Sequence, residues 1–208
     1  MADYKKPDHW ALKARQEGYP ARSVYKLKEI DEKFNLCRPV HNTKSSPGFR
    51  VLDLGAAPGS WSLYILRKMP RVILVSADLS PLSRECDGGL FDGGNVCFIQ
   101  GDITDSAVRE SIGAQGPYNL IISDAAPPTT GNRLIDTSRS LELAEEVTSY
   151  AESFLAAGGN MLVKLFQGQD TAGLLKRIKT LFRSAQSYKP IACRSDSFET
   201  YYVGKTKI

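Results

Sequence analysis

Segment 51–61, with the sequence VLDLGAAPGSW, limits the possible folds of this chain more than any other segment. An apolar run ends at Asp53, a turn of small residues follows, and the next residues can begin a helix. A strand that turns directly into a helix at a glycine brings backbone N–H groups and a helix N-terminus to one point. A nucleotide-like ligand can lie against such a turn, which predicts a ligand site in an α/β fold. A tight turn without a ligand is the alternative.

The glycine spacing of this turn separates two kinds of ligand. The dinucleotide motif reads G-x-G-x-x-G, because a pyrophosphate must approach the helix closely. Here Ala57 takes the place of the second glycine. The form D-x-G-x-x-P-G resembles instead the S-adenosylmethionine loop of Rossmann-like methyltransferases. Under this resemblance Gly55, Gly59 and Trp61 are expected to contribute to cofactor binding.

The length and composition fit one α/β domain. The chain has 208 residues, of which 42% are hydrophobic and 24% charged, as in ordinary globular proteins. No apolar run reaches the length of a membrane span, and the first ten residues are charged where a signal peptide would be apolar. We therefore expect a cytoplasmic protein without a membrane partner, and we expect a monomer.

The cysteines and histidines predict no metal site. The four cysteines form no C-x-x-C pair, and neither His9 nor His41 is grouped with them, whereas a zinc site needs close ligand spacing. The cysteines are read as ordinary thiols in a reducing compartment; they are Cys37, Cys86, Cys97 and Cys193.

The net charge of +4 is modest, but the charges are unevenly distributed. Basic residues gather near both ends, and segment 78–105 between them is acidic. This distribution suits a central cofactor and a polyanion such as RNA at the rim, although charged runs are often only solvated surface. The basic residues are Lys5, Lys6, Lys13, Arg15, Arg22, Lys26 and Lys28, and later Lys176, Arg177, Lys179, Arg183, Lys189 and Arg194.

The hydrophobic periodicity alternates between strand and helix along most of the chain. It predicts an α/β, Rossmann-like fold with a mostly parallel seven-stranded sheet, helices on both faces and an antiparallel edge strand. We expect one domain over 1–208, made of a basic, RNA-facing helical segment at 1–37 and a core at 50–208. Strands are expected at 50–54, 72–77, 96–100, 119–123 and 160–166 and near 185–188 and 199–204, helices within 7–34 and at 58–68, 137–157 and 171–182, and a loop at 38–48.

Four of the five central predicted strands end in aspartate or have it just after. Ligands of open α/β sheets bind beyond the carboxyl ends of the strands, where Asp53, Asp78, Asp102 and Asp124 would gather. Asp78 could accept hydrogen bonds from ribose hydroxyls, and Asp102 from the exocyclic amine of adenine. The neighbouring Leu79 and Ile103 would then lie beside the nucleoside, with Ile103 against the ring. Either aspartate could instead cap a helix.

Lys164 and Glu199 interrupt apolar strand faces. In NMLVKLF, Lys164 shares a face with Leu162 and Phe166, and lysine is rarely buried unless paired or functional. Glu199 shares a face with Tyr201 in the last predicted strand. If that strand lies beside the fifth, Glu199 comes near Lys164; otherwise it is an edge carboxylate facing water.

The region from Val24 to Phe34 has an apolar stripe at helical spacing, formed by Val24, Leu27, Ile30 and Phe34. Lys26 lies at the margin of this stripe. By spacing alone it reads as a surface lysine.

Four short segments together resemble one family. Lys26 in RSVYKL, Asp124 in ISDAAP, Lys164 in VKLFQG and Glu199 in FETYYV resemble the Lys-Asp-Lys-Glu tetrad of the FtsJ/RrmJ family of RNA 2′-O-ribose methyltransferases, and the resemblance spans about 13–205. It implies methyl transfer from S-adenosylmethionine to a ribose 2′-hydroxyl, with a uridine of large-subunit ribosomal RNA favoured. Lys164 would activate the hydroxyl, Lys26 and Glu199 would position and polarise it, and Asp124 would lie between methyl donor and acceptor.

This role agrees with the chemistry of the residues. A ribose hydroxyl is a poor nucleophile, so it must lose its proton during attack or be stabilised by adjacent ammonium groups. Two lysines can do either without a metal. The chain departs from the usual family pattern at Ser60, where glycine is common, and at Pro128, where asparagine is common.

Other functions stay open. Within the same family, the substrate could be transfer RNA. From another class, the chain could be a non-catalytic RNA-binding ribosome-assembly factor, although a binding protein has no need for a lysine inside a strand. An oxidoreductase is a third and weaker alternative. Tyr19, Tyr25 and Tyr201 are candidates for stacking on a base.

Overall fold

The structure is a computed structural model that describes residues 8–38, 48–168, 171–194 and 196–208. The expected loop at 38–48 lies outside these residues apart from its two end positions. The strands are β1 (Arg50–Leu54), β2 (Ile73–Asp78), β3 (Val96–Gln100), β4 (Tyr118–Ser123), β5 (Leu155–Phe166), β6 (Phe182–Tyr188) and β7 (Glu199–Lys207). The helices are α1 (His9–Gln16), α2 (Val24–Phe34), α3 (Ser60–Lys68), α4 (Ser106–Gly113), α5 (Arg133–Phe154) and α6 (Thr171–Leu181), with a 3-10 turn η1 (Leu90–Asp92).

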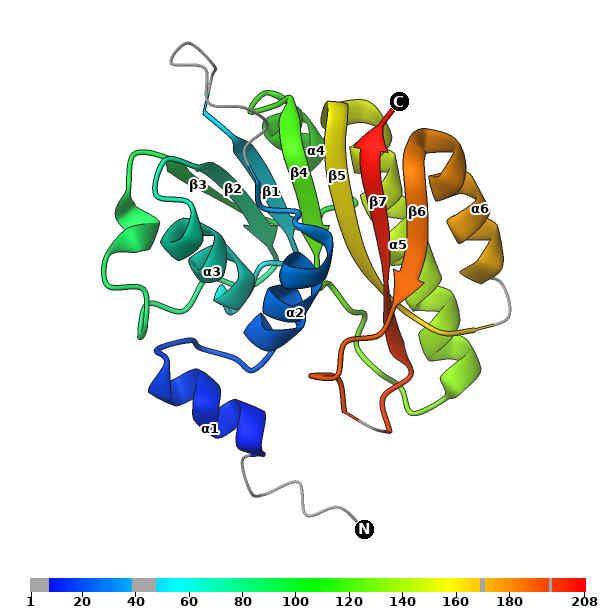
Figure 1. Cartoon of the computed structure of the whole chain (residues 1–208), viewed down its shortest axis with the longest axis horizontal. Helices are drawn as coiled ribbons and strands as arrows, with labels where there is room; N and C mark the ends of the chain where they lie inside the picture. The colour runs from blue at the N-terminus through cyan, green and yellow to red at the C-terminus, as the bar shows by residue number, and fades with distance from the viewer. Residues whose placement is uncertain (1–7, 39–47, 169–170, 195) are drawn as a thin grey trace.

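The seven strands form one sheet in the order β3-β2-β1-β4-β5-β7-β6 (Figure 1). Strands β1 to β5 pair in parallel, and β7 is antiparallel to both β5 and β6. The expected mostly parallel sheet with an antiparallel strand near one edge is confirmed. The antiparallel strand is β7, which lies one position in from the edge strand β6, so the last strand of the chain is inserted beside β5.

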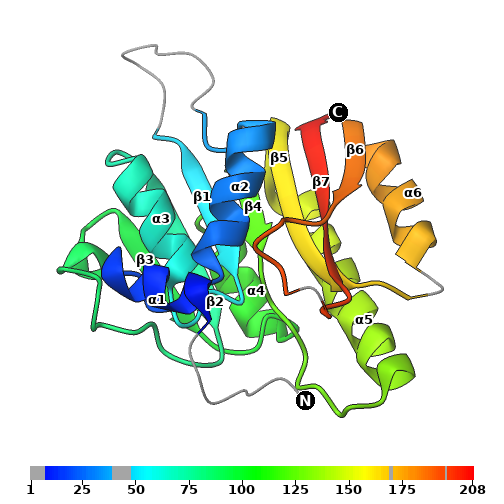
Figure 2. The ribbon, with the colours of Figure 1, turned by 60° about the horizontal axis from the view of Figure 1, so that its bottom comes forward.

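Helices cover both faces of the sheet (Figure 1, Figure 2). Side chains of α2 and α3 share one apolar core with one face of the central strands, and those of α4, α5 and α6 share the core on the other face. Strand β1 is buried on both faces of the sheet. Val51 belongs to the first core, while Leu52 and Leu54 belong to the second. A strand buried on both faces is typical of α/β folds.

The predicted stripe of α2 is confirmed. Val24, Leu27, Ile30 and Phe34 are all buried in the core between α2 and the sheet. The helix ends where Asn35 adopts the left-handed conformation (φ 53°), a residue type that tolerates it. Helix α2 is therefore fixed on the sheet by the face that its periodicity predicts.

Some element boundaries differ from those expected. Strand β5 begins at Leu155 rather than at 160, because the segment AAGG reads as a loop but continues the strand with an irregular register beside β4. Helix α5 begins at Arg133, where Asn132 caps it by accepting hydrogen bonds from two backbone N–H groups. Helix α4 was not predicted from the sequence. Asp105 caps it by accepting from the backbone N–H of Ala107.

Candidate functional site

A cavity of about 240 Å³ lies at the carboxyl ends of the central parallel strands. Its wall includes residues that follow β1, β2, β3 and β4, as expected for an open α/β sheet. Six of the residues predicted to bind a cofactor line it, and Gly59 and Trp61 are not among the lining residues. The lining consists of Gly55, Ala57, Asp78, Leu79, Gly101, Asp102, Ile103, Asp124, Ala125, Ala126 and Leu143.

The turn after β1 is shaped so that only glycine fits at its centre. Gly55 has a φ of +73°, and a Cβ there would lie 2.5 Å from the Cβ of Ala125. The backbone N–H groups of Gly55 and Ala56 both donate to the carbonyl of Ala77 at the end of β2, at 2.8 and 3.2 Å. The turn is thus fixed to the neighbouring strand and leaves bare backbone at the cavity wall, which fits the expected cofactor loop.

Asp78 and Asp102 both line the cavity, and neither caps a helix. Asp78 holds the cofactor loop, since its Oδ2 accepts from the backbone N–H of Ala57 at 2.9 Å. Asp102 accepts from both the backbone N–H and the hydroxyl of Thr104 through the same oxygen, Oδ1. These bonds lower the pKa of Asp102. Both carboxylates keep acceptor capacity for a ligand that offers hydroxyl and amine groups.

The structure brings Lys26, Asp124, Lys164 and Glu199 together as two linked ion pairs. The Nζ of Lys26 lies 2.7 Å from Oε2 of Glu199, and the Nζ of Lys164 lies 3.0 Å from Oδ1 of Asp124. Lys164 also donates to the backbone carbonyl of Asp124. Lys164 and Glu199 are each only 8% exposed. The four side chains come from α2, the end of β4, β5 and β7, and Asp124 also lines the cavity.

The pairing of β5 with β7 sets this geometry. In the antiparallel register Lys164 lies opposite Tyr201, and Phe166 lies opposite Glu199. The last strand does lie beside the fifth, as the expectation for Glu199 required. The direct partner of Glu199 is Lys26, however, and not Lys164.

The charges of the tetrad stabilise one another. Burial acts to raise the pKa of Asp124, but the ammonium groups of Lys164 and Lys26 and the hydroxyl of Tyr201 outweigh it, and the net shift is downward. Burial acts to lower the pKa of Lys26, but the carboxylates of Asp124 and Glu199 outweigh it, and the net shift is upward. The fold therefore favours the charged forms of Asp124 and Lys26, which lie beside Lys164 and Glu199.

Tyr201 is a member of this site that the sequence suggested only as a stacking residue. Its hydroxyl donates to Oδ1 of Asp124 at 2.7 Å, and its side chain is fully buried. Burial and the nearby carboxylate of Asp124 raise the pKa of Tyr201 well above its usual value. Its position two residues after Glu199 on a strand was the available signal, since such residues share a face.

The stacking interpretation of the three tyrosines is wrong for this structure. Tyr19 and Tyr25 are buried like Tyr201. The ammonium group of Lys28 lies over both of their rings, at 4.6 Å from the centroid of Tyr19 and 5.1 Å from that of Tyr25. Rings that are covered in this way offer no face to a base.

Gly59 and Trp61 have structural contacts at the start of α3. Gly59 precedes the helix with a φ of +104°, and a Cβ there would lie 2.9 Å from the ring of Phe91. Trp61 is buried, and its indole Nε1 donates to the carbonyl of Ser23 at 2.9 Å. Its ring centroid lies 6.0 Å from that of Tyr201. The expected cofactor contact of these two residues therefore has no counterpart in the cavity lining.

Asp53 is buried behind the cofactor loop. Its Oδ2 accepts from the hydroxyl of Ser62 at 2.7 Å, and its Oδ1 has no hydrogen-bond partner within the described part of the chain. Burial, reinforced by the carboxylates of Asp124 and Asp78, raises the pKa of Asp53 to about 7 against the opposing hydrogen bond from Ser62. The fold thus favours the neutral form of Asp53.

This shift predicts a pH-dependent stability. Between about pH 4 and pH 7 the unfolded chain ionises Asp53 while the folded chain keeps its proton, so the free energy of unfolding falls as pH rises, by about 1.4 kcal/mol per unit. Asp53→Asn cannot ionise and should lack this slope. Urea unfolding of both proteins without ligand, from pH 5 to pH 8, measures the difference. Parallel pH profiles would contradict the assignment.

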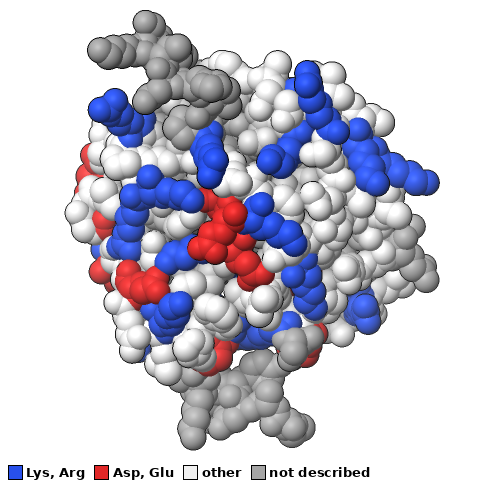
Figure 3. Space-filling model, viewed as in Figure 1, with Lys and Arg blue, Asp and Glu red and all other residues white. Residues whose placement is uncertain are grey.

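Charged residues of both signs are mixed over one face of the molecule (Figure 3). In the view of Figure 3, Lys and Arg side chains surround a compact acidic group near the middle of the face.

Within the described residues, no group of three or more His, Cys, Asp or Glu is placed to hold a metal ion. None of the helices found there has both the length and the apolar character needed to cross a membrane.

Comparison with known proteins identifies the family of this chain. Residues 19–207 match the family model described as FtsJ-like methyltransferase. Ribosomal RNA large subunit methyltransferase E of Treponema denticola is 47% identical over 202 residues, which cover 97% of this chain and 95% of the relative. The protein of the same name from Borreliella afzelii is 44% identical over 199 residues, which cover 96% and 97%.

The fold comparison agrees. A crystal structure described as a ribosomal RNA methyltransferase of Plasmodium falciparum superposes with a TM-score of 0.74 and 28% identity, over 91% of this chain and 98% of that one. The resemblance drawn from the four tetrad segments is therefore confirmed. The family model and the relatives show that this chain is a methyltransferase and belongs to the FtsJ-like family.

Proposed function

We propose that this chain transfers the methyl group of S-adenosylmethionine to a ribose 2′-hydroxyl of large-subunit ribosomal RNA, with a uridine as the favoured target. The observation that supports this most directly is the pairing of two buried lysines with two carboxylates beside the cavity at the strand ends. The relatives named for methylation of large-subunit ribosomal RNA match the chain over nearly its whole length.

The cavity residues fit the expected cofactor. The bare backbone at Gly55 leaves room for a close approach, Asp78 and Asp102 offer acceptors for hydroxyls and an amine, and the buried Ile103 offers an apolar surface for a ring. When bound, S-adenosylmethionine supplies a methyl group activated by a sulfonium charge. Asp124 lies between this cavity and the lysines, where its carboxylate favours a positively charged ligand.

The tetrad would act on the acceptor hydroxyl. Lys164 would either accept the proton of the hydroxyl as a neutral amine or, as an ammonium group, stabilise the negative charge that develops on the oxygen, because a ribose hydroxyl is too weakly acidic to ionise unaided. Lys26, held by Glu199, would add a second positive charge near the developing alkoxide. Asp124 would orient Lys164 through the 3.0 Å contact to its Nζ. All of these groups come from the chain itself.

Asp78 provides a test of the cofactor assignment. We expect Asp78→Asn to weaken S-adenosylmethionine binding by about 10–100-fold, because hydrogen bonds to a charged group contribute about 1.5–3 kcal/mol. Titration of the purified protein with the cofactor measures this. Asp105→Asn is a matched control, since asparagine also caps a helix and Asp105 caps α4 outside the cavity lining. Equal affinity of Asp78→Asn and wild type would contradict the assignment.

The substrate is tested by incubating the protein with labelled cofactor and one of three acceptors: large-subunit ribosomal RNA, assembled ribosomal particles, or transfer RNA. Label in the ribosomal acceptors, mapped to one ribose 2′-oxygen, is the expected result. Label only in transfer RNA would replace the ribosomal assignment with the family alternative. RNA binding without any transfer would favour a non-catalytic assembly factor.

The remaining expectations belong to the same proposal. The chain would act as one catalytic domain over 1–208, with the basic segment 1–37 facing the RNA, in the cytoplasm, as a monomer and without a metal. The salt dependence of RNA affinity tests the basic segment, since contacts to phosphates weaken as salt rises.

A further inference from the structure

The first two residues of α3 make hydrogen bonds to the residues just before α2, the helix that carries Lys26. The hydroxyl of Ser60 accepts from the backbone N–H of Ala21 at 2.8 Å and lies 3.2 Å from the carbonyl of the same residue, to which it donates. Ser60 is 1% exposed. One side chain thus binds both backbone groups of a residue that lies just before the helix.

Trp61 makes the second contact. The carbonyl of Ser23 accepts from the indole Nε1 of Trp61 at 2.9 Å and also from the backbone N–H of Lys26 at 3.0 Å. The carbonyl that closes the first turn at Lys26 is therefore shared with the indole. A buried N–H or carbonyl is costly to leave without a partner, so these bonds fix the turn against α3.

Ser60 and Trp61 also directly follow the loop that lines the cavity. Gly55 and Ala57 contribute to the lining, and Gly59 is the cap of α3. The loop is thus connected to Ala21 and Ser23 through the hydrogen bonds of the first two residues of α3. Lys26 lies only one helical turn further, with its Nζ against Glu199.

We propose that Ser60 and Trp61 are positioning residues for Lys26, and that through them the occupancy of the cofactor cavity sets the alignment of the α2 turn. Ser60 does not line the cavity and is not among the residues expected to contact the cofactor, whereas the cofactor contact expected for Trp61 stays a prediction. This inference rests on the proposed function for its effect on methyl transfer. The coupling between the cavity and α2 is independent of the identity of the acceptor.

The main variant is Ser60→Ala, which removes one hydroxyl and no other atom. We expect the single-turnover rate of methyl transfer to fall about tenfold, which is the loss of about one hydrogen bond's contribution to alignment, while cofactor affinity changes by less than about twofold. Trp61→Phe removes a different bond to the same turn and should also lower the rate at saturating cofactor. If Ser60→Ala fails to fold, the rate of Trp61→Phe at saturating cofactor still decides, because saturation removes any effect on cofactor affinity.

Two readouts separate positioning from a general structural role. In the Lys26→Met background, Ser60→Ala should cause no further loss of rate, because its effect acts through the lysine. Hydrogen exchange without RNA should show that S-adenosylmethionine slows the amides of 24–26 in wild type and has a weaker effect on them in Ser60→Ala. Tyr118→Phe is the control, since it also removes a buried hydroxyl-to-carbonyl bond (2.7 Å) but in β4, outside the site.

The outcomes are distinguishable. If the wild type transfers methyl groups and Ser60→Ala does so at the same rate, the positioning role is wrong. Additive losses of rate in the Lys26→Met background would also overturn that role. Either result leaves the proposed function standing. Absence of transfer by the wild type to any RNA would overturn the proposed function. In that case the exchange of amides 24–26 on cofactor addition still decides the coupling, and equal behaviour of wild type and Ser60→Ala would reject it.

Discussion

Replacing Lys164 with methionine lowers the rate of methyl transfer by about 10²–10⁴-fold, the range expected for loss of a group that moves or stabilises a proton. Methionine keeps an unbranched side chain of similar length in a site that is only 8% exposed, so the apolar surroundings on β5 stay filled. What is lost is the ammonium group that lies 3.0 Å from Asp124. Incorporation of labelled methyl into ribosomal RNA measures the rate.

Cofactor binding should survive this change, because Lys164 does not line the cavity. Titration with S-adenosylmethionine gives the affinity, which we expect to stay within a few-fold of wild type. Lys164→Arg then separates two roles of the amine. A guanidinium keeps the positive charge but is not deprotonated in proteins, so retained transfer indicates electrostatic stabilisation and lost transfer indicates proton removal.

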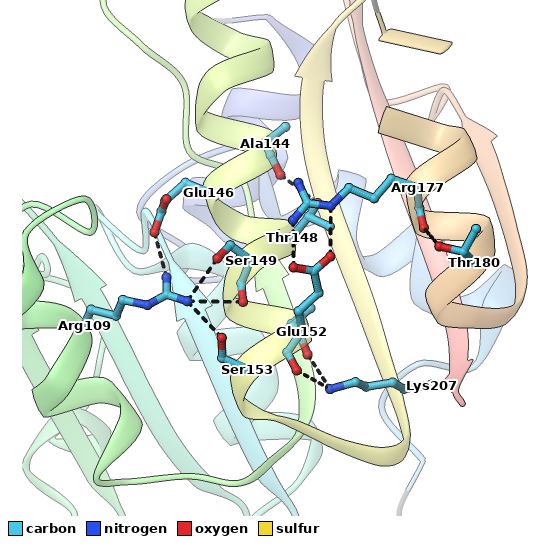
Figure 4. A network of polar contacts seen from close by, with 11 residues as sticks. Arg109, Ala144, Glu146, Thr148, Ser149, Glu152, Ser153, Arg177, Thr180 and Lys207 are labelled. Atoms are coloured by element: carbon cyan, nitrogen blue, oxygen red, sulfur yellow. Dashed lines mark hydrogen bonds and ion pairs between the residues drawn. The ribbon is translucent and has the colours of Figure 1, made fainter. Parts of the chain in front are cut away.

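Lys207 provides the matched control for loss of a partly buried lysine. Its Nζ donates to the carbonyls of Ala151, Glu152 and Leu155, where α5 ends and β5 begins. Figure 4 shows Lys207 beside Glu152. This is the end of the sheet opposite the cavity. Lys207→Met should lower the stability of the protein by leaving those carbonyls without a donor, but it should not change transfer at temperatures where the protein is folded. If Lys164→Met transfers methyl groups at the same rate as the wild type, the proposed role of Lys164 is wrong.

The central part of this site could be predicted because strand periodicity fixes the side of the sheet on which a residue lies. Lys164 interrupts an apolar face, and strands ending in aspartate converge at one edge of a parallel sheet. Both properties follow from the chain without knowledge of its tertiary contacts. The cavity lining at Asp78, Asp102 and Asp124 bears out this argument.

The residues outside the sheet could not be derived in this way. Lys26 lies on a helix whose docking angle no local pattern specifies, and at the margin of an apolar stripe a lysine usually faces solvent. Only the resemblance to the family singled it out. The same limit applies to Trp61. The resemblance predicted its cofactor contact, which stays a prediction, but the bond from its indole to the carbonyl of Ser23 depends on how α2 packs against α3.

The order of the strands in the sheet could also be predicted only in part from the sequence. The sequence predicted strands near 185–188 and 199–204 without a helix between them, which indicates an antiparallel pair but not which partner lies beside β5. Insertion of β7 between β5 and β6 is what brings Glu199 and Tyr201 to the tetrad. That choice depends on long-range packing.

Asp124→Asn is expected to reduce transfer by about 10²–10³-fold and cofactor affinity by about 10–100-fold. The carboxylate balances the charges of Lys164 and Lys26, and asparagine keeps its size but leaves the tetrad with an excess positive charge. A cofactor that carries a sulfonium charge then meets net repulsion at the cavity wall that Asp124 forms. A single substitution should therefore affect both binding and chemistry, unlike Lys164→Met.

The stability of this variant supplies an independent check. Because the pKa of Asp124 is lowered in the folded protein, its carboxylate contributes stability above its usual pKa, and this contribution is lost only as pH falls through the lowered value. Asp124→Asn should thus be less stable than wild type at neutral pH, and the gap should narrow in acid. Tyr201→Phe removes the 2.7 Å donor to the same oxygen without changing the charge, so it should cost less transfer. Equal effects of the two substitutions would show that the hydrogen bond, and not the charge of Asp124, aligns the lysines.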